Sequence, residues 1–109
     1  MAQKNKYPWI GIDEYDELAP GRGYPSMRAS FAAQPYEGQQ RGAAYLRSGK
    51  DFMASFALPL DAITGKRIPG TTLVMHDGKY CWSTDLAYYV DQYNLRLPPK
   101  IERHILRAG

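Results

Sequence analysis

The alternation of apolar and polar positions is clearest from Thr71 to Leu106, where it predicts a β-hairpin followed by two helices. Residues 71–75 are β-branched and apolar, and residues 80–82 resume the apolar pattern after Asp77-Gly78. Asp-Gly favours a two-residue hairpin turn because glycine readily adopts a positive φ. A turn at Asp77-Gly78 would place four large side chains on one face, which we assign to the core. These side chains are Leu73, Met75, Tyr80 and Trp82.

Two helices are predicted after the hairpin. The first has apolar residues at i, i+3, i+4 and i+7, which is typical of one helix face. They are Leu86, Tyr89, Val90 and Tyr93. Ser83 is placed to cap its N-terminus, and Asn94 to end it in a left-handed conformation. Pro98-Pro99 then predicts the start of a helix whose apolar stripe is Ile101, Ile105 and Ala108.

Upstream patterns add a strand at 27–33, a helix at 35–48 ended by Gly49, and a strand at 51–58. The second strand would bury Phe52, Ala54, Phe56 and Leu58 on one face. Gly38 and Gly42 weaken the predicted helix, and we expect them to permit its close packing against the sheet.

The resulting order, β-α-β-β-β-α-α, predicts a single small α+β domain at 26–109. We expect a mostly antiparallel sheet of about four strands with two to three helices. Residues 1–25 are expected to form an N-terminal arm and loop that is partly irregular.

Composition narrows the choice of environment and partner. The chain has 109 residues, with 44% hydrophobic and 23% charged, so it has the composition of an ordinary globular domain. Its net charge of +3 permits a polyanionic partner without requiring one. Cys81 is the only cysteine, which excludes an internal disulfide. No run is apolar enough for a signal peptide or a membrane span, so we expect a cytoplasmic protein without a membrane partner.

The last predicted helix carries cations on one face. They are Lys100, Arg103, His104 and Arg107, with Arg96 nearby. Arg96, Lys100, Arg103 and Arg107 are our candidate nucleic-acid-binding residues, because cations on one helix face contact phosphates. The alternative is a solvated face, since cations also stabilise a helix C-terminus.

The sequence offers no recognisable catalytic or metal-binding motif. His76, Cys81 and His104 are the residues from which a small hydrolase or nuclease site would have to be built, but no spacing ties them together. The carboxylates at 13, 14, 16 and 17 lack the alternating ligands and glycine of a calcium loop. We therefore assign no catalytic residue, no metal site and no cofactor, and a hydrolase or nuclease remains a second alternative.

Tyrosine is abundant, with nine residues, and its amphipathic ring suits protein contacts. Tyr88 lies off the core stripe of its helix, and Tyr7 and Trp9 lie in the N-terminal arm. These three are our candidate partner-binding residues. The leading hypothesis is a small cytosolic, non-enzymatic binding or accessory module that contacts a protein partner or a second copy of itself.

One stretch resembles a known group of proteins. It consists of residues 77–82, Leu86, Tyr89-Val90, 93–95 and Leu97-Pro98. This pattern resembles small uncharacterised proteins of intestinal Firmicutes that are often carried on mobile elements. The resemblance implies an accessory role in the DNA transfer, regulation or defence of such an element. The nucleic-acid alternative is therefore an accessory protein of a mobile element that binds through its basic C-terminal helix.

Overall fold

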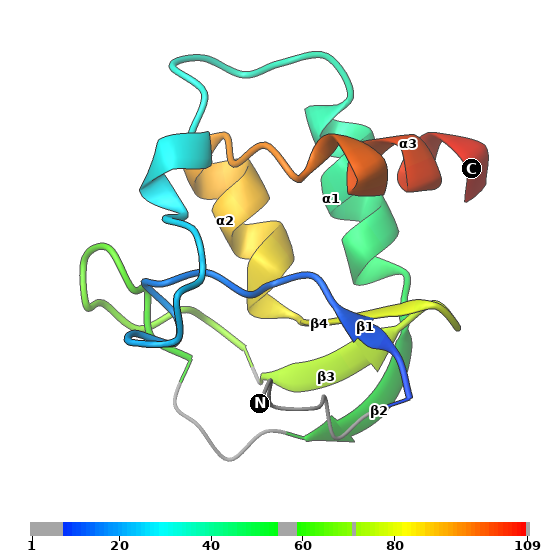
Figure 1. The fold of residues 1–109 in the computed structure, drawn as a ribbon, viewed down its shortest axis with the longest axis horizontal. Helices are drawn as coiled ribbons and strands as arrows, with labels where there is room; N and C mark the ends of the chain where they lie inside the picture. The colour runs from blue at the N-terminus through cyan, green and yellow to red at the C-terminus, as the bar shows by residue number, and fades with distance from the viewer. Residues whose placement is uncertain (1–7, 55–58, 71, 109) are drawn as a thin grey trace.

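The computed structural model of the protein describes residues 8–54, 59–70 and 72–108. Within these ranges the chain forms one four-stranded sheet, three α-helices and a short 3-10 helix (Figure 1). In chain order the elements are β1 (Ile10–Gly11), the 3-10 helix η1 (Arg28–Ser30), α1 (Gln39–Arg47), β2 (Lys50–Ala54), β3 (Leu73–His76), β4 (Tyr80–Ser83), α2 (Asp85–Tyr93) and α3 (Pro99–Ala108). The predicted α+β class is confirmed, and the order of strands and helices matches in outline, with a first strand that comes from another segment.

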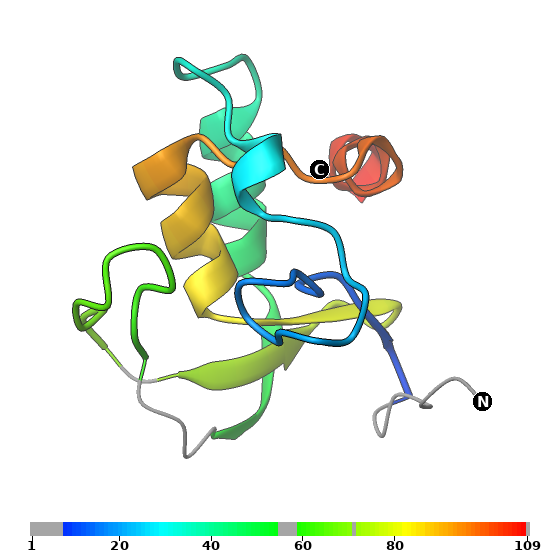
Figure 2. The same ribbon diagram turned by 60° about the vertical axis from the view of Figure 1, so that its left-hand side comes forward.

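The sheet has the strand order β1-β4-β3-β2. The β4–β3 and β3–β2 pairs are antiparallel, as predicted for most of the sheet, and β1 runs parallel to β4. Helices α1 and α2 cover the same face of the sheet, and α3 stands to one side of them (Figures 1 and 2). No helix among the described residues has the length and apolar character needed to cross a membrane.

The β3–β4 hairpin turns at Gly78-Lys79, so the predicted turn at Asp77-Gly78 is wrong. Met75 lies opposite Trp82. Asp77 Oδ1 accepts the backbone N–H groups of Lys79 and Tyr80, and only Gly78 has a positive φ, 94°. This pattern resembles the turn class with glycine at its first central position. The pairing of β3 with β4 is shifted by two residues from the pairing that a turn at Asp77-Gly78 would give. Because strand side chains alternate, an even shift keeps Met75, Tyr80 and Trp82 on the predicted core face, where all three are buried.

The first strand lies at Ile10–Gly11 and not at 27–33. In the region predicted to be a strand, residues 28–30 form η1. The carboxylate of Glu17 accepts the backbone N–H groups of Met27 and Arg28. Local side-chain acceptors of this kind compete with the hydrogen bonds of a sheet.

The N-terminal arm contributes to the body of the protein. Ile10–Gly11 pairs with β4, and the side chains of Ile12 and Tyr15 belong to the hydrophobic core. The segment that follows them is irregular as far as η1.

Helix α1 is shorter than predicted, because it begins at Gln39 after Gly38, whose φ is 89°. Neither glycine packs against the sheet: a Cβ added at Gly38 or Gly42 would meet no atom within 4 Å. The expectation of close packing there is wrong. Close packing occurs instead at Gly49, where an added Cβ would lie 2.8 Å from Cζ2 of Trp82.

Strand β2 is exposed along its whole described length, so the predicted buried face is wrong for Phe52 and Ala54. Phe52 is 48% exposed. The strand lies at an edge of the sheet, and its pairing with β3 is irregular between Asp51 and Met53. Such an irregularity interrupts the alternation of faces. The predicted positions 56 and 58 lie outside the described residues.

The C-terminal helices match the predicted pattern closely. In α2, Leu86, Tyr89 and Val90 are buried, Tyr93 is half-buried, and Asn94 follows in the left-handed conformation with a φ of 55°. The N-cap of α2 is Thr84 and not the predicted Ser83. Ser83 belongs to β4, and its Oγ accepts the backbone N–H of Asp85 at 3.4 Å.

Helix α3 begins at Pro99 and buries Ile101 and Ile105. Ala108 is exposed, so its assignment to the apolar stripe is wrong. It is the last residue of α3, whose final turn extends away from the sheet (Figure 1).

Candidate functional site

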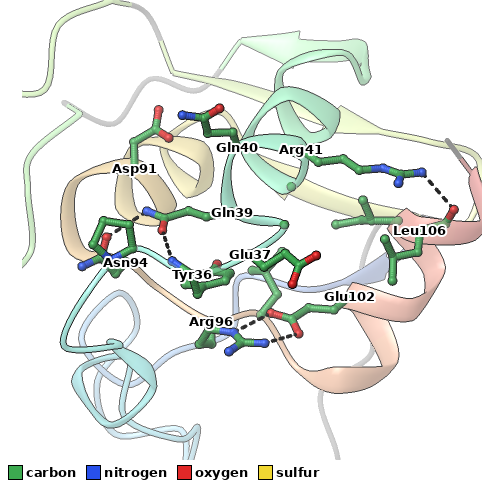
Figure 3. Close-up of a pocket in the computed structure, with 15 residues that line it drawn as sticks. Tyr36, Glu37, Gln39, Gln40, Arg41, Asp91, Asn94, Arg96, Glu102 and Leu106 are labelled. Atoms are coloured by element: carbon green, nitrogen blue, oxygen red, sulfur yellow. Dashed lines mark hydrogen bonds and ion pairs between the residues drawn. The ribbon is translucent and has the colours of Figure 1, made fainter.

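A groove of about 1090 Å³ separates the N-terminal part of α1 from α3 and is closed at one end by the C-terminus of α2 (Figure 3). Residues 35–42 form one wall, and Leu97, Ile105 and Leu106 contribute apolar surface. Three stretches that are distant in the sequence therefore meet at one site.

Gln39 holds the wall of the groove in place. Its side chain is buried, and its Nε2 donates to the backbone carbonyl of Val90 and to Oδ1 of Asn94. Its Oε1 accepts the backbone N–H of Tyr36. The hydroxyl of Tyr36 in turn donates to the backbone carbonyl of Leu95. These bonds fix the approach to α1 against the end of α2.

Arg96 forms a bridge across the base of the groove. Its Nε and Nη2 atoms donate to the two carboxylate oxygens of Glu102 at 3.0 and 2.9 Å, and its guanidinium lies 4.2 Å from the ring centroid of Tyr36. A second hollow of about 500 Å³ also borders this ion pair, with Phe31 and Pro99 in its lining. The Arg96–Glu102 pair therefore stands between two neighbouring hollows.

The mouth of the groove carries polar groups that remain available. The side chains of Glu37 and Gln40 are exposed, and neither forms a hydrogen bond or ion pair within the described ranges. Arg41 donates to the backbone carbonyl of Leu106 at 3.0 Å, which links α1 to α3. Gly42 opens onto the groove, because a Cβ there would meet no neighbour within 4 Å.

The groove brings side chains of several chemical types together. Its described lining includes carboxylates, arginines, side-chain amides and aliphatic groups, but no Ser, Cys or His. Glu37 offers hydrogen-bond acceptors, and Gln40 offers both a donor and an acceptor. The arrangement suits the main chain and mixed side chains of a polypeptide.

The candidate nucleic-acid-binding residues lie on two sides of α3. Lys100, Arg103 and Arg107 are exposed, and none of them forms an ion pair within the part of the chain that the structure describes. Arg96 faces the groove and is paired with Glu102. The structure thus groups three of the four residues.

Two of the three candidate partner-binding residues, Trp9 and Tyr88, are described, and they contact different parts of the fold. Tyr7 lies outside the described residues. The ring of Trp9 stacks on His76 with a centroid distance of 3.7 Å and meets Phe52 edge-on at 4.9 Å. Tyr88 is half-buried on α2, where its hydroxyl donates to Asp61.

Asp61 was not singled out by the sequence, yet it organises a buried polar cluster. The residue is 1% exposed, and its Oδ2 accepts the hydroxyls of Tyr88 and Tyr93 at 2.7 and 2.6 Å. Its Oδ1 accepts the backbone N–H groups of Ile63 and Thr64. Burial opposes ionisation, but these hydrogen bonds outweigh it and lower the pKa of Asp61. The cluster fastens the 59–70 loop to α2.

Two of the three residues considered for a hydrolase or nuclease site lie opposite each other in the hairpin, because His76 of β3 pairs with Cys81 of β4. Adjacent strand residues face opposite sides, so Cys81 lies on the face away from Tyr80. The ring of His104 packs edge-on against Tyr80 at 4.8 Å, whereas His76 stacks on Trp9. Cys81 is buried. The structure therefore places His76 and Cys81 on one face of the hairpin and His104 against the other face, so the three residues do not form one site.

A second unpredicted cluster surrounds Asp77. Its Oδ2 accepts the hydroxyl of Tyr45 and lies 2.7 Å from Nε2 of His104. Although burial opposes ionisation, hydrogen bonds from Tyr45, the backbone of the turn and His104 lower the pKa of Asp77 to about 2. The sequence predicted the hairpin turn that contains Asp77, but not the contacts of Asp77 with Tyr45 and His104.

The acidic residues of the N-terminal segment support local structure. Asp13 accepts the backbone N–H of Ser83 at 2.8 Å, and burial raises its pKa. Glu17 accepts three hydrogen bonds from residues 26–28, which outweigh desolvation and lower its pKa to about 2. Within the described ranges no three His, Cys, Asp or Glu residues are arranged to hold a metal ion.

Comparison with family models, curated proteins and solved structures finds no match for this chain. The resemblance to small proteins of intestinal Firmicutes therefore stays a prediction, and function has to be argued from the geometry of the protein.

Proposed function

We propose that this protein is a cytoplasmic, non-enzymatic binding module that seats an extended segment of a partner protein in the groove between α1 and α3. The observation that supports this proposal best is the groove itself, which is lined by Gly42 and by the exposed side chains of Glu37 and Gln40. Because the resemblance points to mobile elements, we further propose that the partner is a protein of such an element.

The dimensions and polarity of the groove favour a polypeptide over a small molecule. Its volume of about 1090 Å³ lies just above the roughly 300–1,000 Å³ of small-molecule pockets, which are predominantly apolar. Here charges of both signs alternate with aliphatic surface. A peptide supplies main-chain donors and acceptors to Glu37 and Gln40, and its side chains cover Leu97 and Leu106.

Hydrogen bonds also hold the walls of the groove in place. Gln39 is held by hydrogen bonds to Val90 and Asn94, and α3 is tied to α1 through Arg41. A site held in place before binding loses less conformational entropy when it is occupied. This supports a role in recognition that does not depend on rearrangement of the fold.

Gly42 provides a direct test, because it lines the groove and a Cβ added there would meet no atom within 4 Å. We would select binders from a phage-displayed library of random peptides about twelve residues long and measure their affinity by fluorescence anisotropy. Gly42→Phe should fill the groove and weaken binding by roughly tenfold or more. Gly42→Ala, the matched control, should bind like the native protein.

The proposal fails if the selection enriches no peptide, or if the enriched peptides bind Gly42→Phe as tightly as they bind the native protein. Light scattering on the same samples tests the alternative of self-association. A native dimer that Gly42→Phe converts to a monomer would identify a second copy of the chain as the occupant and overturn the proposal of a different partner protein.

A further inference from the structure

We propose that Lys79, Lys100, Arg103 and Arg107 form a cationic strip that binds the phosphate backbone of a nucleic acid. This inference does not depend on the groove between α1 and α3. It rests on the outer face of α3 and on the contact between this helix and the tip of the β3–β4 hairpin.

Three of the four cations share one face of α3. Lys100, Arg103 and Arg107 are separated by three and four residues, which is the spacing of neighbours on a helix surface. At 1.5 Å per residue they extend over roughly 10 Å of the helix axis. Phosphates follow one another along a nucleic-acid strand, so a row of cations contacts them better than a single cluster does.

The hairpin brings the fourth cation to this row. His104, which lies on α3 between Arg103 and Arg107, is 2.7 Å from Asp77 at the hairpin turn. Its ring also packs edge-on against Tyr80. The Nζ atom of Lys79 lies 5.3 Å from the centroid of that same Tyr80 ring. Lys79 and His104 of α3 thus contact the same ring, which places Lys79 beside the helix that carries the other three cations, although it precedes them by more than twenty positions in the sequence.

The nearby carboxylates are already engaged. The side chain of Asp77 is 10% exposed and holds Tyr45 and His104. Glu102 is paired with Arg96 on the groove side of α3. Within the described part of the chain, Lys79, Lys100, Arg103 and Arg107 form no ion pair, so the strip presents four uncompensated charges.

The packing of α3 favours a nucleic acid over an anionic membrane. A helix that binds a membrane surface inserts its apolar face among the lipid headgroups. In α3 that face consists of Ile101 and Ile105, which are 5% and 4% exposed because they pack into the body of the protein. The large apolar side chain of α3 that stays exposed is Leu106, at 56%, and it lines the groove, whereas Lys100, Arg103 and Arg107 are exposed on the face that would contact phosphates.

The test is fluorescence anisotropy with a fluorescein-labelled DNA duplex of about 20 base pairs, titrated between about 50 and about 200 mM salt. Four phosphate contacts predict a slope of log K against log salt of about −3.6. Lys79→Ala should reduce the magnitude of this slope by about 0.9, because it removes one contact. Arg103→Glu should weaken binding roughly tenfold or more at low salt.

Lys100→Glu is a second binding variant, chosen because it should not destabilise the helix. It places a carboxylate in the first turn of α3, where the helix dipole favours a negative charge, and it should weaken binding as strongly as Arg103→Glu. The matched control is Lys66→Glu, which makes the same charge change in the 59–70 loop, on the opposite side of the molecule from α3 (Figure 1). Its affinity should stay within about twofold of the native value.

Two kinds of result would overturn the proposal. One is failure of the DNA test, seen either as an absence of DNA binding at the lowest salt or as an equal loss of binding in Lys66→Glu and Lys100→Glu. The other is binding to vesicles that contain phosphatidylserine, sensitive to the strip variants, in a protein that does not bind DNA. That outcome would assign the strip to a membrane surface.

Discussion

Gly49 and Gly42 lie seven residues apart, yet their surroundings are opposite. An added Cβ at Gly49 would lie 2.8 Å from Trp82 Cζ2 and 3.2 Å from the backbone carbonyl of His76. The indole cannot easily move, because it is buried and its Nε1 donates to the carbonyl of Leu46. Gly42 is itself buried, yet a Cβ added there would meet no atom within 4 Å. The same glycine-to-alanine change should therefore have opposite effects at the two positions.

We expect Gly49→Ala to destabilise the protein by about 1–3 kcal/mol, the usual cost of overpacking. Gly42→Ala should stabilise it by up to about 1 kcal/mol, because alanine is the better helix former. Urea unfolding followed by circular dichroism measures both values. A Gly49→Ala protein as stable as the native one would show that Trp82 is free to move.

Asp77 gives a prediction about pH. The pKa of Asp77 is lowered from 3.8 to about 2 in the folded protein, so the folded state favours its charged form. A lowered pKa stabilises the fold above the unfolded value, and this contribution is lost as pH falls from about 5 to about 2. It amounts to roughly 2 kcal/mol.

Asp77→Asn should therefore cost more stability at pH 7 than at pH 2, with urea unfolding at each pH as the measurement. Asp13 and Asp85 have raised pKa values, which change the pH dependence of stability in the opposite direction. Subtracting the free energy of unfolding of the variant from that of the native protein at each pH removes their contribution and leaves that of Asp77. Asp51→Asn, at an exposed position of β2, is the control. A cost for Asp77→Asn that does not change with pH would contradict the assigned hydrogen bonds.

Among the elements, the patterns that depend on periodicity alone were predictive. The apolar stripe of α2 follows from the 3.6-residue period of a helix. The core face of the hairpin follows from the two-residue period of a strand, and it was predicted correctly although the position of the turn was not. The strand predicted at 27–33 failed because the carboxylate of Glu17, ten residues away, captures the backbone of Met27. A pattern within one segment contains no information about such a partner.

The contact among α1, the hairpin and α3 gives a prediction of coupling. Tyr45 from α1 and His104 from α3 both reach Oδ2 of Asp77. Groups that share one partner do not act independently, so Tyr45→Phe and His104→Ala should be non-additive by about 0.5–3 kcal/mol in a double-mutant cycle. The cycle is measured by urea unfolding at pH 7.

The control cycle combines His104→Ala with Tyr88→Phe. Tyr88 bonds to Asp61 in a different cluster, so these two changes should add within about 0.5 kcal/mol. Equal coupling in both cycles would mean that the effect is a global one and does not arise at Asp77.

In the whole molecule, the fold class was predictable from the sequence, but the sites were not. The groove needs residues 35–42, Asp91 and Leu106, which no spacing rule connects. Arg96 was grouped with the cations of α3 because it precedes them, yet it is bound to Glu102 and stacks on Tyr36. Charge can be read from a sequence, but the side of a helix that the rest of the fold covers has to be seen in the structure.

Helix α3 serves two surfaces, and this leads to a final prediction. Glu102 and Leu106 line the groove, whereas Lys100 belongs to the strip. Two residues along a helix correspond to about 200° around its axis, so Lys100 and Glu102 point in nearly opposite directions. A peptide in the groove and a nucleic acid on the strip should therefore bind at the same time.

We expect Gly42→Phe to lose peptide binding while keeping the salt slope for DNA, and Lys100→Glu to show the reverse. A saturating peptide should change the DNA affinity of the native protein by no more than about twofold, measured by anisotropy, because ligands without differential contacts do not influence each other. Displacement of DNA by the peptide would show that the two surfaces are one site. Loss of both activities in either single variant would instead show that α3 has left its place on the body, which the burial of Ile101 and Ile105 opposes.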